Sequence, residues 1–228
     1  MQNSFHFDEI FRRYLWLRQD EFQGKKVLEL GSGTALPGLL TAKIGADQVT
    51  LSDDAWQVNT IKNILEAVKI NNLQEPKIQV KGLTWGDYTE ELFELTNLDF
   101  IIGSDLFFDP EVFEPLLITI AWLLEHNPQV LIAVQERSSD WCLEEHLLKW
   151  KLKCSYIYPK DFLQGTGLED QLDRQTYNFH LENISRIEIT YCSKSSFFVQ
   201  KFNFDFPRKL SIFWGGEKLV KMLWFWTF

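Results

Sequence analysis

Two short segments near the amino terminus combine glycines and carboxylates in an order that suits nucleotide chemistry. In VLELGSGTALPGLLTAKIGA, Val27 to Ala46, a buried β-type run ends in Glu29 and passes through Gly31, Ser32 and Gly33 into a helical pattern. Glycines permit tight turns and close approach of a ligand, and a helix start offers unpaired N–H groups to polar ligand atoms. This turn is therefore expected to bind a nucleotide-like cofactor.

A second acidic residue follows about one strand–helix–strand unit later. Asp53 ends the next β-type run, where it is placed to accept hydrogen bonds from ribose hydroxyls. A strict G-x-G-x-x-G pattern fails at its third glycine, which is Leu36 here, so a dinucleotide site is disfavoured without being excluded. Glu29 before the first glycine and Pro37-Gly38 after the second also point elsewhere. The alternative is a tight strand–helix turn that binds nothing.

The elements that must position these residues alternate along the chain. Runs rich in Val, Ile, Leu and Phe alternate with helical patterns up to about residue 135, which is typical of right-handed βαβ units around a buried parallel sheet. Later segments predict one more helix, two more strands and a loop over residues 159–183. We expect strands at Lys26–Leu30, Val49–Ser52, Ile78–Val80, Phe100–Gly103, Val130–Val134, Lys153–Tyr158 and Ile184–Tyr191, and helices near Leu36–Ile44, Gln57–Asn71, Glu111–His126 and Ser139–Trp150.

The helix after Trp56 has an apolar face. Val58, Ile61, Leu65 and Val68 recur at near-helical spacing, whereas its charged residues turn elsewhere. This pattern predicts that the face carrying these four side chains packs on the sheet.

Bulk properties narrow the class of partner. A length of 228 residues fits one domain with appendages, and the formal net charge of -9 argues against broad binding to nucleic-acid phosphates and favours a basic partner. The three cysteines and four histidines lack metal-ligand spacing, so no metal site is expected. No export signal is visible, and the apolar stretches are shorter than the roughly 20 residues that cross a bilayer, so we expect no membrane segment.

Motifs after the third and fourth strands extend the pattern. Leu83-Thr84-Trp85-Gly86-Asp87 follows the third strand, and Ser104-Asp105-Leu106-Phe107-Phe108 follows the fourth. Together with the glycine turn, these segments resemble the seven-β-strand S-adenosylmethionine-dependent methyltransferases. Within that class they resemble the family-sixteen, lysine methyltransferase-like group, which has a D-x-x-Y/F signature after strand four. The resemblance covers about Tyr14 to Tyr191 and includes the runs LPGLLTAKIGA, GLTWGD, SDLFFDPEVFE and RSSDWCLEEHLLKWKLKC.

The resemblance implies a fold and a set of roles. The fold is α/β: a Rossmann-like, seven-stranded sheet, mostly parallel with an antiparallel last strand and with helices on both faces. The cofactor is S-adenosyl-L-methionine. By position, the methionine end of the cofactor would be lined by Glu29, Gly31, Ser32 and Gly33. Asp53 would bind the ribose, Trp85 would contact the adenine and Ser104 would close the pocket. Asp105 and Phe108 would be catalytic at the acceptor side. For Asp105 and Phe108 the alternatives are a cap of the helix beginning near Pro110 and a core residue, and Trp85 could be an ordinary packed aromatic.

The resemblance also implies an activity. We expect a protein N-methyltransferase acting on a basic side chain, which is histone arginine if the substrate of the most similar member of the group applies here. The expected partner is a histone tail or a chaperone. The expected locations are the nucleus and the cytoplasm. The alternatives are a protein-lysine methyltransferase and a catalytically weak interaction module in a transcription or chaperone complex. A nicotinamide-dependent oxidoreductase is a weaker reading. Direct sequence-specific nucleic acid binding is not expected, and the oligomeric state stays open.

Both ends of the chain depart from the family pattern. Residues 1–24 are expected to form a helical segment without the family's Trp-Pro, residues 25–195 the methyltransferase domain, and residues 196–228 an aromatic-rich tail of unknown role. Such a tail could pack on the domain, bind a partner or membrane surface, or result from an incorrect gene model, which we favour.

Overall fold

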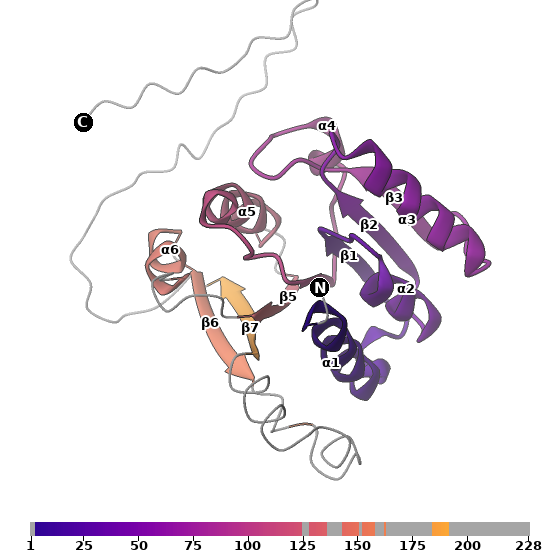
Figure 1. The fold of residues 1–228 in the computed structure, drawn as a ribbon, viewed down its shortest axis with the longest axis horizontal. Coiled ribbons are helices and arrows are strands. Elements are labelled where there is room, and N and C mark those ends of the chain that lie inside the picture. The colour runs from indigo at the N-terminus through magenta and orange to yellow at the C-terminus, as the bar shows by residue number, and fades with distance from the viewer. Residues whose placement is uncertain are drawn as a thin grey trace, which may run out of the picture. The chain divides into compact units, whose positions relative to one another are not determined.

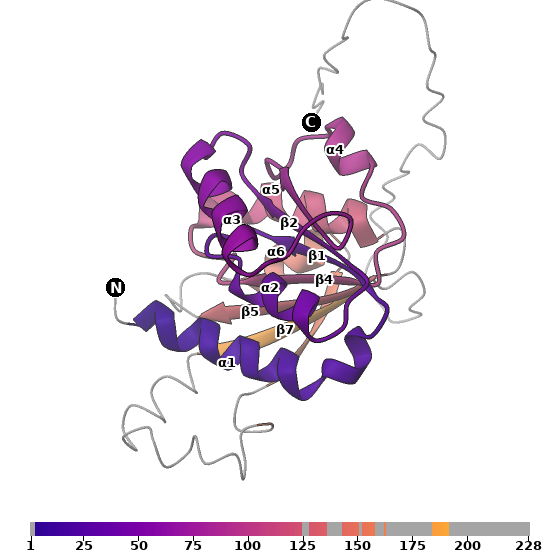
Figure 2. The same cartoon turned by 90° about the vertical axis from the view of Figure 1, so that its right-hand side faces the viewer.

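The chain forms a three-layer α/β unit with a central sheet (Figures 1 and 2). The computed structural model describes residues 3–124, 128–135, 143–150, 152–157, 162 and 184–191, all of which belong to one compact unit spanning Met1–Ser193. The expected loop at 159–183, apart from Phe162, and the aromatic-rich tail lie outside the described residues.

Five parallel strands form the part of the sheet that carries the predicted site. Their order is β3-β2-β1-β4-β5, and Leu28 of β1 lies opposite Thr50 of β2 and Ile101 of β4. The pairings of β2 with β3 and of β4 with β5 are also parallel. The strands are β1 (Lys26–Leu30), β2 (Gln48–Asp53), β3 (Ile78–Gly82), β4 (Phe100–Ser104) and β5 (Gln129–Gln135), each within two residues of its expected bounds.

Two further strands extend the sheet beyond β5. The strand β7 (Ile184–Tyr191) pairs antiparallel with β5, and β6 (Leu152–Ile157) pairs antiparallel with β7. The registers place Ile187 opposite both Ile132 and Tyr156.

Alternate residues of each central strand enter two separate cores, as the two-residue period of a strand requires. Leu28 and Ile101 join one core with buried residues of α5, whereas Val27 and Ile102 join the other with residues of α1, α2 and α3. Figure 1 shows α2 and α3 on one side of the sheet and α5 and α6 on the other. The helices are α1 (Asn3–Leu17), α2 (Leu36–Lys43), α3 (Val58–Ile70), α4 (Glu90–Phe93), α5 (Pro110–Leu123) and α6 (Leu143–Lys149).

The face that α3 buries differs from the expected one. Ile64 and Val68 are buried and Ile61 packs against the core, but Val58 is 56% exposed and Leu65 is 51% exposed. Ile64 and Leu65 are consecutive and therefore about 100° apart on the helix, so only one of them can face the sheet. The apolar pattern alone favoured the wrong one.

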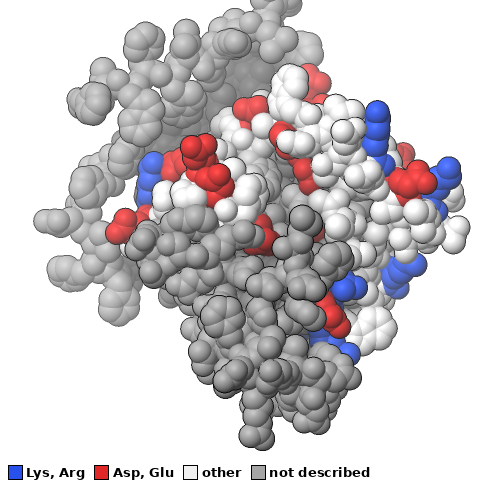
Figure 3. Space-filling view, viewed as in Figure 1, with Lys and Arg blue, Asp and Glu red and all other residues white. Residues whose placement is uncertain are grey.

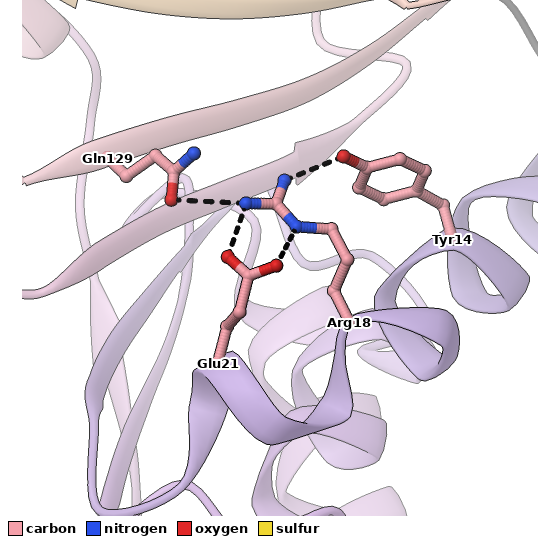
Figure 4. A network of polar contacts seen from close by, with 4 residues as sticks. All are labelled: Tyr14, Arg18, Glu21 and Gln129. Carbon is pink, nitrogen blue, oxygen red and sulfur yellow. Dashed lines mark hydrogen bonds and ion pairs between the residues drawn. The ribbon is translucent and has the colours of Figure 1, made fainter. Parts of the chain in front are cut away.

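The amino-terminal segment is tied to the sheet by a polar network around Arg18 (Figure 4). Its guanidinium donates from Nε to Glu21 Oε1 at 2.6 Å, from Nη1 to the Tyr14 hydroxyl at 2.7 Å and from Nη2 to Gln129 Oε1 of β5 at 3.4 Å. A second bond from Nη2 to Glu21 makes the ion pair bidentate. Beside the network, Phe22 of a short 3-10 helix (Gln19–Phe22) packs against Phe100 with ring centroids 4.5 Å apart.

This network predicts a pH-dependent contribution to stability. The hydrogen bond from Arg18 lowers the pKa of Glu21 below its ordinary value of 4.5. A depressed folded-state pKa gives stability that is present above the unfolded pKa and is lost as the pH falls through the folded pKa. We expect Glu21→Gln to lower the free energy of unfolding by about 1 kcal/mol at pH 7, since the pair is partly exposed. Urea unfolding should show that difference vanishing in acid below pH 4.5, and an unchanged difference at pH 3 would contradict the assignment.

Among the helices that the structure describes, none is long and apolar enough to cross a membrane.

Candidate cofactor and acceptor site

The predicted site residues meet at the carboxyl edge of the parallel sheet. Three loops that leave this edge each add one more backbone hydrogen bond between neighbouring strands. Ser32 N donates to Ser52 O at 2.8 Å, Leu83 N to Asp53 O at 2.7 Å and Asp105 N to Ala133 O at 2.8 Å. The loops after β1, β3 and β4 are thereby anchored side by side where open α/β sheets bind ligands.

The turn after β1 is built around Gly31. Its φ is +58°, in the left-handed region, and a Cβ there would lie 2.8 Å from Leu106 Cδ2 and 3.0 Å from Trp85 Cζ2. Only glycine combines this conformation with such close neighbours. The loops after β3 and β4 therefore both close against the glycine turn.

Glu29 lies beneath that turn and is 1% exposed. Its carboxylate faces Gly38 of α2, where a Cβ would come 2.5 Å from Glu29 Oε2 and 2.2 Å from Leu51 Cδ2. Its carbonyl oxygen accepts a hydrogen bond of 2.7 Å from the Ser52 hydroxyl. Because Gly38 has no side chain, the carboxylate of Glu29 fits beside α2, next to the predicted site of the methionine end.

Two features at the turn suit a polar ligand. Ser32 is 5% exposed, and its Oγ is buried without a hydrogen-bond partner in the part of the chain that the structure describes. A buried hydroxyl that is not satisfied costs about 1–3 kcal/mol, so a ligand atom that bonds to it stabilises the site. Gly33 is exposed, has φ +49° and has no atom within 4 Å of a would-be Cβ, so a ligand can approach its backbone. These residues fit a cofactor with polar groups.

Asp53 closes the turn from the end of β2. Its Oδ2 accepts from Gly33 N at 2.8 Å and its Oδ1 from Asp54 N at 2.9 Å. Two carboxylate oxygens have about four acceptor positions, so two remain for a diol. The sequence predicts the ribose contact but not that the same carboxylate holds the glycine turn in place.

The loop carrying Trp85 is fixed at two points. Thr84 Oγ1 donates to Asp54 Oδ1 at 2.7 Å, and Gly86 N donates to Thr119 Oγ1 of α5 at 2.9 Å. Trp85 itself is half-buried, packs against the core and abuts Gly31. It lies beside the glycine turn as a packed aromatic, and its contact with adenine stays a prediction. The sequence does not predict the hydrogen bond between Thr84 and Asp54, although both residues are next to the motifs.

After β4 the chain passes from two half-buried residues through two core residues to the surface. Asp105 has φ +57°, a conformation that aspartate tolerates better than most residues. Leu106 and Phe107 are each 2% exposed, and Phe108 is 47% exposed. Ser104 is half-buried at the end of β4. Asp105 and Phe108 therefore both stand at the carboxyl edge, on either side of two core residues.

Both alternatives for the acceptor residues fail. The helix α5 is capped by Asp109, whose Oδ1 accepts from Glu111 N at 3.0 Å, so Asp105 is not its cap. Phe108 is too exposed to be a core residue.

No set of three or more His, Cys, Asp or Glu side chains that could hold a metal ion occurs within the described part of the chain. A hollow of about 400 Å³ lies between α1 and α2, lined by Arg12, Arg13, Trp16, Leu36, Lys43 and neighbouring residues.

The strand order and the glycine turn define a class, the S-adenosylmethionine-dependent methyltransferases with a Rossmann-like fold. Solved structures share the fold: the methyltransferase domain of bacterial CtHen1 has a TM-score of 0.57 at 12% identity, covering 81% of this chain and 99% of that one. The ribosomal protein L11 methylase from Lactobacillus delbrueckii subsp. bulgaricus has a TM-score of 0.55 at 13% identity, with 82% and 78% covered.

The chain belongs to the lysine methyltransferase family, whose model matches residues 3–147. It is 42% identical to the histone-arginine methyltransferase METTL23 of Homo sapiens over 155 residues, which are 67% of this chain and 80% of that protein. It is 41% identical to METTL23 of Mus musculus, covering 67% of this chain and 60% of that protein. It is 35% identical to the protein N-lysine methyltransferase METTL21A of Mus musculus, covering 58% and 61%. The resemblance inferred from the motifs is confirmed.

Proposed function

We propose that this protein transfers a methyl group from S-adenosylmethionine to a basic side chain of a protein, and that the acceptor is a histone arginine. The observation that carries the proposal is the pairing of a cofactor turn, Gly31 to Gly33 held by Asp53, with an acidic residue and an exposed aromatic ring, Asp105 and Phe108, at the same sheet edge. Relatives named as histone-arginine methyltransferases at 41–42% identity support the choice of acceptor.

The chain's own residues would hold the cofactor as follows. The backbone of Gly31 and Gly33 and the Ser32 hydroxyl would bind its amino-acid part, with Glu29 beneath them. Asp53 would accept hydrogen bonds from the ribose hydroxyls, and Trp85 would contact the adenine, with Ser104 closing the pocket. S-adenosylmethionine, when bound, supplies an electrophilic methyl group on a sulfonium.

The acceptor side needs alignment more than acid catalysis. Asp105 would accept a hydrogen bond from the acceptor nitrogen and orient its lone pair, which is where an enzyme gains most in an in-line displacement. Phe108 would place its ring face against a cation. A guanidinium or ammonium is protonated in water, so the nitrogen must lose a proton around the transfer.

Three further features are proposed for the protein. The complete sheet is proposed to have the seven-stranded methyltransferase arrangement with β7 as its antiparallel strand, supported by the pairing of β7 with β5 and β6. A histone tail is the proposed partner, a chaperone the second, and nucleus and cytoplasm the proposed locations. The domain limits at residues 24 and 195 stay predictions.

A lysine acceptor is the second candidate. The family model is described as lysine methyltransferase, and METTL21A is named a protein N-lysine methyltransferase. Arginine and lysine differ in the geometry of their donors, so the chemistry of the methylated residue separates the two.

Variants of the acceptor side test the proposal. Using tritiated S-adenosylmethionine and purified core histones, we expect Asp105→Asn to lower kcat by about thirtyfold, since hydrogen bonds to charged groups contribute about 1.5–3 kcal/mol. Asparagine also tolerates the left-handed backbone of this position, so the variant should fold. Phe108→Ala should lower the rate roughly fivefold, in keeping with a partly exposed cation–π contact.

Asp109→Asn is the matched control, because asparagine caps helices as well as aspartate does. Its kcat should stay within about twofold of the wild-type value in the same assay. Equal rates for Asp105→Asn and Asp109→Asn would contradict the role of Asp105.

A further inference from the structure

Three aromatic side chains form one cluster beside α4. The ring centroids of Tyr88 and Phe93 are 6.4 Å apart, those of Tyr88 and Trp122 are 5.6 Å apart and those of Phe93 and Trp122 are 5.4 Å apart. Tyr88 and Phe93 are each 47% exposed, and Trp122 is half-buried against the core. We call these three residues the aromatic surface. Large apolar rings grouped at the surface are typical of interaction sites.

The aromatic surface rests on a fixed support. Leu92 of α4 is 2% exposed in the core directly before Phe93, and Thr89 caps α4 by accepting from Leu92 N at 3.4 Å. Trp122 comes from α5, the helix whose Thr119 hydroxyl accepts from Gly86 N. Because a well-supported surface loses little side-chain freedom on binding, more of its contact energy appears as affinity.

The surroundings of the aromatic surface are acidic. Residues 81–98 contain four acidic side chains, at Asp87, Glu90, Glu91 and Glu94, and one basic side chain, Lys81, which is paired with Glu94. Hydrogen bonds from its own backbone N–H and from Thr89 lower the pKa of Glu91, so it is ionised at neutral pH. In Figure 3 Asp and Glu predominate toward α4 and α5, whereas most Lys and Arg lie on the α2 and α3 side. The surface therefore complements a cation.

We propose that the aromatic surface is a docking site for an arginine-containing segment of the substrate protein, separate from the acceptor nitrogen. This inference rests on the proposed function. The loop after β4, which carries Asp105, and the loop that runs from Trp85 to Tyr88 both close against Gly31, so one substrate chain can extend from the acceptor side onto the aromatic surface. The docking site would select substrates by a segment that is not itself methylated.

Arginine fits this surface better than lysine. A guanidinium stacks on aromatic faces, is weakly hydrated and pairs with carboxylates in a fixed fork, whereas an ammonium is a compact, strongly hydrated charge. Exposed rings next to carboxylates offer both contacts at once. The docking site should therefore discriminate between the two cations even though both carry one positive charge.

The test is fluorescence anisotropy on the full chain without methyl donor, at 150 mM salt. The probes are labelled peptides of alternating glycine with either arginine or lysine, identical in length. We expect the arginine peptide to bind at least threefold more tightly. Combining Tyr88→Ser with Phe93→Ser should weaken it about tenfold, and Glu90→Lys should weaken it about fivefold, with the difference shrinking at high salt.

Matched controls come from the opposite layer. Trp16→Ser removes a ring that is 48% exposed on α1, and Glu66→Lys reverses an exposed charge on α3. Both should bind the arginine peptide within twofold of the wild type. The docking site would be overturned if the double variant bound the arginine peptide as tightly as the wild type, or if the controls lost as much affinity as the double variant. Light scattering that shows wild-type dimers and a monomeric double variant would instead assign the surface to a second copy, which also overturns it.

Failure of the proposed function is measured separately. If the wild type transfers no methyl group to histones but the double variant still binds the arginine peptide more weakly than the wild type does, the proposed activity is wrong and the docking site stands. If transfer is normal and the double variant neither loses the peptide nor raises KM for histones, the docking site is wrong and the activity stands.

Discussion

Replacing Asp53 with alanine is expected to weaken S-adenosylmethionine binding by about a hundredfold. Two acceptor positions for the ribose diol are lost, and since hydrogen bonds to a charged group contribute about 1.5–3 kcal/mol each, a hundredfold loss is the low end of the range, as suits a half-buried carboxylate. The variant also removes the partner of Gly33 N–H, so the glycine turn loses its link to the end of β2. Isothermal titration of the purified chain with S-adenosylmethionine and S-adenosylhomocysteine measures the loss.

Two controls separate these causes. Asp53→Asn keeps an oxygen that can accept from Gly33 N–H but removes the charge, so we expect a loss of about tenfold. Asp47→Ala removes an exposed aspartate just before the amino end of β2 and should leave binding unchanged. If Asp53→Ala binds the cofactor as tightly as Asp47→Ala does, the ribose assignment is wrong.

Adding one methyl group at Gly38 is expected to destabilise the fold. The Cβ of Gly38→Ala would lie 2.2 Å from Leu51 Cδ2 and 2.5 Å from Glu29 Oε2, and both neighbouring residues are fully buried. Neither can swing into solvent, so overpacking should lower the free energy of unfolding by about 2 kcal/mol. Thermal unfolding should show a decrease in Tm of about 4–8 °C for a chain of this size.

Gly24→Ala is the contrasting variant, because it introduces backbone strain without a steric collision. Gly24 has φ +69° and no atom within 4 Å of a would-be Cβ, so alanine there meets backbone strain alone, about 1 kcal/mol. Gly38 is helical and carries no such strain, so its cost is the collision with Glu29 and Leu51. A Gly38→Ala protein that unfolds like the wild type would show that Glu29 can leave its position beneath the turn.

The extent to which the sequence predicts the fold depends on burial. Strands β1, β2, β4 and β5 are largely buried on both faces, so apolar runs such as Val130 to Val134 locate them within two residues, whereas the edge strand β3 is mostly half-buried. The short helix α4 has only Leu92 in the core and was not predicted, because a single buried residue has no period. In α3 the spacing predicts a helix, but it does not decide between Ile64 and Leu65.

The candidate site shows a similar division. Glycines and acids at strand ends can be recognised because the backbone requires them, as at Gly31 and Asp53. The contacts between loops cannot be read from the sequence: Leu106 closes over Gly31, and Thr84 bonds to Asp54, across long separations. The cap of α5 by Asp109 needed the structure as well, since Asp105 also stands shortly before Pro110.

Identifying the residue that receives the methyl group tests the proposed activity and the proposed acceptor in one experiment. The purified full chain is incubated with tritiated S-adenosylmethionine and core histones, which are then hydrolysed so that the labelled amino acid can be separated. We expect labelled methylarginine with the wild type and about a hundredfold less with Asp53→Ala at limiting cofactor. Label in methyllysine would contradict the arginine acceptor, and no label with a chain that binds the cofactor would contradict the proposed activity on histones.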